Sequence, residues 1–388
     1  DVAVAYGADL GKGFEFKSYV PATGKNPTDL SFDDTFTTDV FSIFGQYSID
    51  LSDATELSFE GRYDKEKRSV DNNVPATTSA LYYGGGAPIN PAMSAGGSKI
   101  PSRDKSYDQF QPKISLTTTA ENTTIYASYG VGFRSGGFNS SGSAALINSQ
   151  LNIPVSAGLG VSDSFNKEVS KSFEVGFKGR YLDGRLAING ALFETEVDDN
   201  QFFEFFAGPW GLLRVVTSID QLDISGSELD FKYALTDSIR LDGGLGFTDG
   251  EIKKNAHRPN TIGNNAPLAP EHTYNLGIQY ESSFSANFDL VVRADYMEVG
   301  ETWFHTVQNN QQPSVWGAIL GFPVNSDMSK SVRDAYNLID LRASLIGENL
   351  TLTVWGRNIT DEKYLAEVIP APEFGGSFIH EAPYATYG

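Results

Sequence analysis

The sequence predicts an all-β chain that forms a transmembrane, antiparallel, up-and-down β-barrel. Three observations support this prediction: many segments alternate apolar and polar residues, short and long connections alternate along the chain, and charged residues gather on one face of each segment. Side chains on a strand point alternately to opposite faces, so each segment has one apolar and one polar face. Either a protein core or lipid must cover the apolar face.

The alternation is clearest in residues 123–139, TTIYASYGVGFRSGGFN, where Ile125, Tyr129 and Phe133 alternate with small or polar residues up to Arg134. The period recurs in six further segments, at 56–63, 172–181, 228–235, 274–281, 290–296 and 339–345. Most expected strands alternate for about 9–15 residues, whereas soluble strands average about 5–6 and membrane strands need about 9–11. A charge facing lipid costs about 2–4 kcal/mol, which explains its absence from the apolar face.

The connections agree with a barrel that crosses a membrane. Short turns are expected at 52–55, 119–122, 182–184, 236–238, 282–286 and 347–349, and long connections at 71–105, 134–166, 254–269, 306–332 and 365–383. Short turns on one rim and long loops on the other are typical of transmembrane barrels. One strand, 185–198, becomes acidic after Leu192, so it either rises out of the membrane there or contains a bulge.

The chain has 388 residues and a formal net charge of −20. We expect about 12 complete strands, a partial strand before residue 21 and the start of another near the end, which indicates a fragment of a larger barrel. The acidic balance argues against a nucleic-acid partner. No apolar run reaches about 18 residues, so no transmembrane helix is expected. A large soluble β-sandwich, propeller or solenoid is the alternative fold, but no short fixed repeat supports the last two.

No enzyme is expected, because no catalytic constellation is present. Ser164 and Lys167 have Ser-x-x-Lys spacing but no companion motif. The glycines of 244–250 precede no helix that could hold a phosphate. The chain has no cysteine, and its four histidines lack metal-ligand spacing. We therefore expect no cofactor and no metal site.

Two motifs carry a resemblance to a known family. The first is YASYGVGFRSGGFN at 126–139, and the second is NITDEKY at 358–364. Together with the hairpin KEVSKSFEVGFKGRYLDGRLAINGALFETEVDDNQ, they resemble the TonB-dependent outer-membrane receptors. The matching motif residues, for which we expect structural roles, are Gly132, Phe133, Gly136, Gly137, Asn358, Asp361 and Tyr364. The glycines can adopt positive φ where the strand leaves the wall, and Asn358 and Asp361 can bond their own backbone where the ladder ends.

The resemblance runs from about residue 37 to the end and implies that residues 1–388 are the C-terminal portion of such a barrel. The family's plug domain, its TonB-contacting segment and its early strands have no counterpart in the sequence. The family's terminal aromatic residue is also absent after Gly388. The resemblance implies location in the bacterial outer membrane, with TonB, membrane lipid and a ferric siderophore or similar small ligand as partners.

Candidate ligand-binding residues are expected in the external connections. The stretch FFEFFAGPW at 202–210 is unusually rich in aromatic residues for a solvated loop. It can form a platform for an amphipathic ligand, or it can pack against other loops and close the mouth of the barrel; we favour the second. Arg134 lies where the polar face ends and can reach a ligand. The candidates are Phe202, Phe203, Phe205, Phe206, Trp210, Arg134, Trp303, His305 and Trp316.

By resemblance, we expect TonB-dependent active uptake of a scarce nutrient across the outer membrane, most commonly a ferric siderophore. Haem, cobalamin and oligosaccharides are alternative substrates that these residues do not exclude. A passive channel without a plug is the alternative function. A soluble glycan-binding β-protein is a third hypothesis from a different class.

Overall fold

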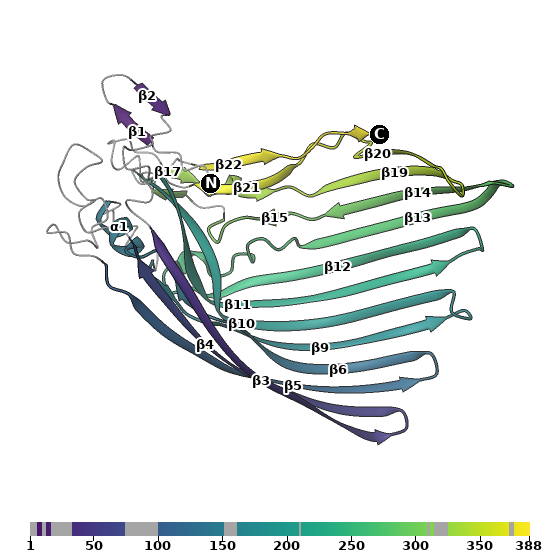
Figure 1. The fold of residues 1–388 in the computed structure, drawn as a ribbon, viewed down its shortest axis with the longest axis horizontal. Coiled ribbons are helices and arrows are strands. Elements are labelled where there is room, and N and C mark those ends of the chain that lie inside the picture. Colours follow the sequence, from purple (N-terminus) through teal and green to yellow (C-terminus); the bar gives the residue numbers. More distant parts are fainter. Residues whose placement is uncertain are drawn as a thin grey trace.

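A computed structural model shows a single curved wall of antiparallel strands (Figure 1). The structure describes residues 6–9, 13–16, 33–73, 100–150, 161–208, 211–308, 311–313, 325–371 and 376–388. The wall is a 13-stranded sheet in the order β23-β20-β19-β14-β13-β12-β11-β10-β9-β6-β5-β4-β3. Every neighbouring pair is antiparallel, so the predicted all-β, up-and-down architecture is confirmed.

Twelve wall strands are long, and a thirteenth begins near the end of the chain. The strands are β3 (Asp34–Ser52), β4 (Thr55–Asn72), β5 (Arg103–Ala120), β6 (Thr123–Arg134), β9 (Glu168–Tyr181), β10 (Leu186–Gly208), β11 (Gly211–Ala234), β12 (Ile239–Lys254), β13 (His272–Ser285), β14 (Phe288–Val299), β19 (Tyr336–Ile346), β20 (Thr351–Arg357) and β23 (Thr386–Tyr387). The predicted count of about 12 strands plus the start of another is confirmed.

Small elements gather at the end of the wall that carries the long connections (Figure 1). They are the pairs β1 (Tyr6–Asp9) with β2 (Gly13–Phe16), β7 (Gly137–Phe138) with β8 (Ser164–Phe165), β15 (Thr302–Trp303) with β18 (Val332–Arg333), β16 (Gln311–Pro313) with β17 (Asn325–Asp327) and β21 (Leu365–Ala371) with β22 (Gly376–Glu381), together with helix α1 (Ser143–Gln150) and the 3₁₀ helices η4 (Pro259–Thr261) and η5 (Met328–Lys330). Among the described residues before 21, β1 and β2 pair with each other and not with the wall, so they do not form the expected partial wall strand.

The alternation of the sequence becomes two distinct faces of the wall. On β13, Leu276 and Ile278 are about half exposed on the apolar face, at 50% and 46%. The opposite face carries side chains that bond across strands: Arg293 donates to both carboxylate oxygens of Asp242, at 2.8 and 2.9 Å, and Tyr126 donates to Glu174 at 2.6 Å. We call this polar face the inner wall. Charged side chains gather on the inner wall, whereas the apolar belt carries residues such as Leu276 and Ile278, so the wall suits a lipid exterior and an aqueous interior.

Buried side chains gather beyond the apolar belt, at the end with the long connections. One buried cluster joins β10, β11, β12 and the connection after β12, through Val197, Phe202, Ile219, Leu222, Ile252 and Ala266. Among the described residues, no helix has both the length and the apolar character needed to span a membrane. The protein core therefore lies where the long connections meet.

Candidate ligand-binding mouth

The extended β10–β11 hairpin projects at the end of the wall that carries the long connections, which we call the mouth. Residues 202–208, expected in a loop, instead lie on β10, and β11 begins at Gly211. The loop prediction is therefore wrong for Phe202, Phe203, Phe205 and Phe206. For 185–198, the sequence left open a rise out of the membrane or a bulge. The strand shows the rise, because β10 pairs with β9 and β11 over these residues without a register shift and continues past the apolar belt.

The buried side chains of this hairpin change from odd to even positions at Asp199. Below it, the buried side chain Val197 occupies an odd position, whereas above it Phe202, Glu204 and Phe206 are buried at even positions. Asp199 has φ 53°, and it and Asp220 are skipped in the pairing between the strands. Aspartate tolerates this left-handed conformation better than most residues. The backbone change keeps the buried face of the hairpin directed at one cluster on both sides of Asp199.

A buried ion pair joins the hairpin to the connection after β12. Arg258 Nε donates to Glu204 Oε1 at 3.0 Å, and a second guanidinium nitrogen donates to Glu204 Oε2. Both side chains are almost fully buried, with 8% and 6% of their surface exposed. A buried charge without a partner is costly, so this bidentate pair fixes Glu204 and Arg258 to each other.

His305 lies next to this ion pair and is also buried. Its Nδ1 accepts a hydrogen bond from the Val307 backbone at 3.0 Å, and its ring meets the Phe202 ring edge-on at 6.3 Å between centroids. Burial lowers the pKa of His305 to about 4; the Glu204 carboxylate opposes this change and Arg258 adds to it. His305 is therefore a neutral, packed side chain at neutral pH.

The aromatic residues of the hairpin divide into two groups. Phe202 and Phe206 are buried in the mouth, and Trp303 is buried on β15, where its carbonyl accepts a hydrogen bond from Leu268. Phe203 and Phe205 lie partly exposed on the other face and meet edge-to-face at 5.4 Å. The exposed guanidinium of Arg214 lies 4.3 Å from the Phe203 ring centroid. Phe202, Phe206 and Trp303 therefore match the packing interpretation rather than an open platform, whereas Phe203 and Phe205 stay partly exposed.

Arg134 is the candidate that stays accessible. It ends β6, its side chain is 64% exposed, and its nearest carboxylate, Glu168, is 3.9 Å away. Its even position places it on the inner wall with Tyr126. A loosely paired, exposed guanidinium at the mouth is available to an anionic or oxygen-rich ligand. Two other candidates, Trp210 and Trp316, lie outside the described residues.

The motif that follows β6 ties the next connection to the wall. Gly132, Gly136 and Gly137 do not have positive φ, so the predicted reason for these glycines is wrong. Gly136 and Gly137 permit close approach instead: an added Cβ at Gly136 would lie 2.4 Å from the Tyr107 ring, and at Gly137 2.7 Å from the Phe165 ring. Gly132 faces the Ser170 hydroxyl, and the Phe133 ring lies 6.0 Å from the Lys167 ammonium.

Asn139 connects this motif to the hairpin. Its side-chain amide donates to the Val216 carbonyl at 3.0 Å and accepts from the Val216 N–H at 2.8 Å, so it pairs with β11 as a neighbouring strand would. The same nitrogen donates to the Ser162 carbonyl at 2.7 Å. Gln201, at the base of the hairpin, donates to the Ser135 carbonyl at 2.9 Å. The hairpin is thus held in place by the connection between β6 and β9.

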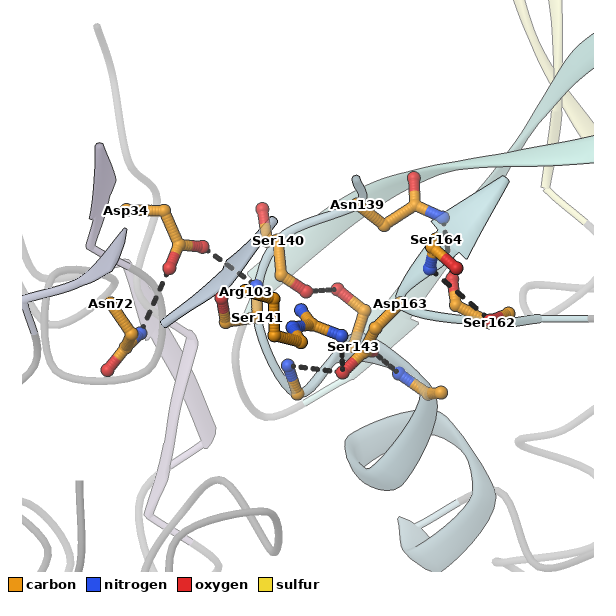
Figure 2. A network of polar contacts seen from close by, with 12 residues as sticks. Asp34, Asn72, Arg103, Asn139, Ser140, Ser141, Ser143, Ser162, Asp163 and Ser164 are labelled. Carbon is orange, nitrogen blue, oxygen red and sulfur yellow. Dashed lines mark hydrogen bonds and ion pairs between the residues drawn. The ribbon is translucent and has the colours of Figure 1, made fainter. Parts of the chain in front are cut away.

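Two carboxylates hold the start of helix α1 against the wall (Figure 2). Asp163 accepts hydrogen bonds from the Gly142 and Ala144 backbone at 3.0 and 2.9 Å and from Arg103 at 3.3 Å. Asp34, on β3, accepts from the Ser141 backbone at 2.8 Å and from Asn72 at 3.1 Å. This network fixes the connection after β6 to β3, β4 and β5.

The second motif forms a compact turn after β20. Asn358, with φ 49°, exchanges two hydrogen bonds with the Glu362 backbone, at 2.8 and 2.9 Å. Asp361 accepts from the Ala385 backbone at 3.0 Å. Tyr364 stacks on Tyr336 with 4.0 Å between ring centroids. Asn358 thus bonds local backbone at the end of the ladder, as expected, whereas Asp361 bonds a backbone group 24 residues away.

The sequence interpretation missed Glu204 and Arg258. Glu204 could have been found from its place inside FFEFF, because a carboxylate within an apolar run needs a buried partner. Nothing local pointed to Arg258, which is 54 residues away in the chain. Within the described residues, no group of three or more His, Cys, Asp or Glu side chains could hold a metal ion.

Comparison with known proteins finds a matching family profile and several relatives. A family profile described as "TonB dependent receptor-like, beta-barrel" matches residues 2–359. The chain is 24% identical over 326 residues to the probable TonB-dependent receptor BfrD of Bordetella pertussis, and 26% over 314 residues to the catecholate siderophore receptor Fiu of Escherichia coli (strain UTI89 / UPEC). Each alignment covers 78% of this chain, but 37% and 38% of the relative.

Solved structures show the same fold at low identity. The ferric yersiniabactin uptake receptor FyuA of Yersinia pestis has a TM-score of 0.66 and 14% identity, with 91% of this chain and 45% of that chain covered. The copper transporter OprC has a TM-score of 0.60 and 14% identity, with 91% and 47% covered. The chain therefore spans less than half the length of each relative.

Proposed function

The chain belongs to the TonB-dependent receptor β-barrel family, and from this premise we propose that it forms part of a receptor for active uptake of a scarce nutrient. The family comprises outer-membrane transporters rather than enzymes, and this excludes the soluble β-protein hypothesis. In the proposed cycle, ligand binds at the mouth, TonB displaces a plug domain, and the ligand enters the periplasm.

One observation carries the proposal: a packed mouth lies over a charged inner wall. The hairpin residues Phe202, Glu204 and Phe206 are buried against the connections after β12 and β14, while the wall below carries charged pairs such as Arg293 with Asp242. Packing of the hairpin against these connections favours gated passage over free diffusion. The passive-channel alternative receives no comparable support from the mouth.

A ferric siderophore is the substrate class we propose. Relatives named for siderophores, Fiu and FyuA, support it, and Arg134 offers an exposed cation on the inner wall for an oxygen-rich complex. Phe203 and Phe205, with Arg214 beside them, offer partly exposed aromatic area on the outer side of the hairpin. Because one structural relative is a copper transporter, copper is the competing substrate.

The test is uptake of radiolabelled iron by iron-limited cells that produce the complete receptor, with and without TonB. We expect uptake of a ferric siderophore that stops when TonB is deleted or the proton-motive force is collapsed. Uptake that persists without TonB would support the passive channel instead. Copper uptake without iron uptake would keep the active mechanism but replace the substrate.

A further inference from the structure

A second polar site lies at the opposite end of the inner wall, near the short turns. A cavity of about 520 Å³ is lined by five basic side chains, Arg180, Arg185, Lys232, Arg240 and Arg293, and by one carboxylate, Asp242. Such a concentration of positive charge is unexpected in a chain whose net charge is −20. It lies far along the strands from the mouth described above.

Three of these basic side chains already have partners. Arg293 is clamped by Asp242 and Asp295, at 2.8 and 2.6 Å. Arg240 pairs with Glu281 at 3.2 Å. Arg185 donates to the Ala234 carbonyl at 2.9 Å and also to the Leu235 carbonyl. Their charge or donor capacity is at least partly used within the wall.

Arg180 and Lys232 are different. Both are exposed, and among the described residues neither side chain has a hydrogen bond or a close ion pair. Lys232 lies opposite Asp242 in the register, but both oxygens of that carboxylate accept hydrogen bonds from Arg293. The strand register places both in one row across the wall: Arg180 pairs with Ala187 of β10, and Ala187 pairs with Lys232 of β11. Their backbones are therefore about 10 Å apart, twice the spacing between strands.

Ala187 leaves open space between the two cations. Its methyl group is the only side chain between Arg180 and Lys232 in this row, and it lines the cavity. Two long basic side chains about 10 Å apart can converge on one group placed between them. A guanidinium offers two parallel donors to an oxyanion, and an ammonium adds a point charge.

We propose that Arg180 and Lys232 form an oxyanion-binding site on the inner wall, for a carboxylate or phosphate group seated over Ala187. The anion has two possible sources with the same chemistry: an acidic side chain of a polypeptide segment that occupies the barrel interior, or a small anion free in the aqueous interior. The site does not depend on which nutrient is bound at the mouth, so it stands or falls separately from the proposed uptake.

The test compares thermal unfolding of the complete receptor with that of a double variant, Arg180→Gln/Lys232→Gln. Lys113→Gln is the matched control, because Lys113 is also exposed on the inner wall but already has an acidic partner, Glu60, at 3.2 Å. Inorganic phosphate is the probe, titrated at constant ionic strength. If the double variant is not recovered folded, the single variant Lys232→Gln replaces it.

If the site binds a free anion, phosphate is expected to raise the unfolding midpoint of the wild-type receptor saturably, by about 2 °C or more. The control is expected to show the same rise, and the double variant is expected to show none. If the anion is a carboxylate of the polypeptide, phosphate is expected not to change the unfolding midpoint. The midpoint of the double variant is then expected to lie about 2 °C or more below that of the control, and this difference is expected to shrink in about 1 M salt. The proposal is overturned if phosphate acts equally on the double variant. It is also overturned if, without a phosphate response, the double variant matches or exceeds the control.

Discussion

At the scale of single residues, the Glu204–Arg258 pair decides how firmly the hairpin is joined to the connection after β12. Replacing Glu204 by Gln removes one charge and leaves Arg258 buried without its counterion. Breaking a buried pair in this way costs about 3–5 kcal/mol. We expect Glu204→Gln to destabilise the packed hairpin by that order, measured as faster hydrogen exchange of β10 and β11 amides above Asp199.

The matched control for this prediction is Glu251→Gln. Glu251 pairs with Lys253, but both side chains are about 40% exposed, so the pair is screened by water. Exposed pairs contribute about 0–1 kcal/mol. If Glu204→Gln changed exchange no more than Glu251→Gln does, the buried pair would not be what fixes the hairpin.

His305 makes the packing of the mouth depend on pH. Its pKa falls to about 4 in the packed mouth, below its ordinary 6.5, because burial disfavours the charged ring. Below pH 6.5 an opened mouth therefore takes up a proton that the packed mouth does not. The stability of the packed state is full above pH 6.5 and falls as the pH drops toward 4, by on the order of 3 kcal/mol.

Hydrogen exchange of the Val307 amide across this pH range measures the effect, after correction for the intrinsic pH dependence of exchange. His305→Gln is the matched variant, because its amide oxygen can still accept from Val307 but does not titrate in this range. We expect the excess opening at low pH to disappear in His305→Gln. An equal pH response in both proteins would assign the effect to other groups.

At the scale of elements, the β10–β11 hairpin depends on one backbone conformation. Asp199 has φ 53°, which a β-branched residue adopts only at a cost of about 1–2 kcal/mol, whereas glycine adopts it freely. Asp199→Val is expected to loosen the hairpin above residue 199, and Asp199→Gly is expected to preserve it. Both lose the weak 3.4 Å contact with Asn166, so that contact cancels in the comparison.

Limited proteolysis of the two Asp199 variants under native conditions provides the measurement. Faster cleavage within residues 200–219 of Asp199→Val alone is the expected outcome. Equal cleavage of the two variants would mean that the positive φ does not limit the hairpin.

Asn139 supplies the second constraint on this hairpin. Asn139→Ala removes both hydrogen bonds to Val216 and leaves its N–H without that partner. Leaving a backbone N–H without its partner costs about 1–3 kcal/mol, which corresponds to roughly 5- to 150-fold acceleration of Val216 exchange. Ser162→Ala is a suitable control, because Asn139 bonds the Ser162 carbonyl, which alanine retains. Unchanged Val216 exchange in Asn139→Ala would contradict the proposed bridging role.

The elements were largely predictable from local pattern, and the mouth was not. Period-two alternation fixed the lower halves of strands such as β13, because one face must be apolar throughout. The same rule failed at Asp199, where a backbone angle exchanges the faces, and nothing in a two-residue period signals that exchange. Gly136 and Gly137 were found by motif, but their role depends on Tyr107 and Phe165, which approach from other parts of the chain.

At the scale of the whole molecule, the two faces of the wall must meet different solvents. Leu276→Arg places a charge on the apolar face of β13, and a charge facing lipid costs about 2–4 kcal/mol near mid-bilayer. Gln279→Arg places the same charge on the inner wall of the same strand, where Arg240 and Arg293 are its cross-strand neighbours. We expect heat-modifiable, folded receptor in outer membranes to decrease for Leu276→Arg more than for Gln279→Arg. The reverse order would contradict the assignment of faces.

The most direct measurement of the central claim is accessibility along β13 in the complete receptor, reconstituted in a bilayer. Nitroxide labels at 274–280, one position at a time, would be exposed in turn to oxygen, which concentrates in lipid, and to a water-soluble nickel complex. The account predicts that oxygen collisions peak at 276 and 278 and are low at 275, 277 and 279. Collision rates without a two-residue period, or nickel access equal at every position, would contradict a lipid-facing barrel wall.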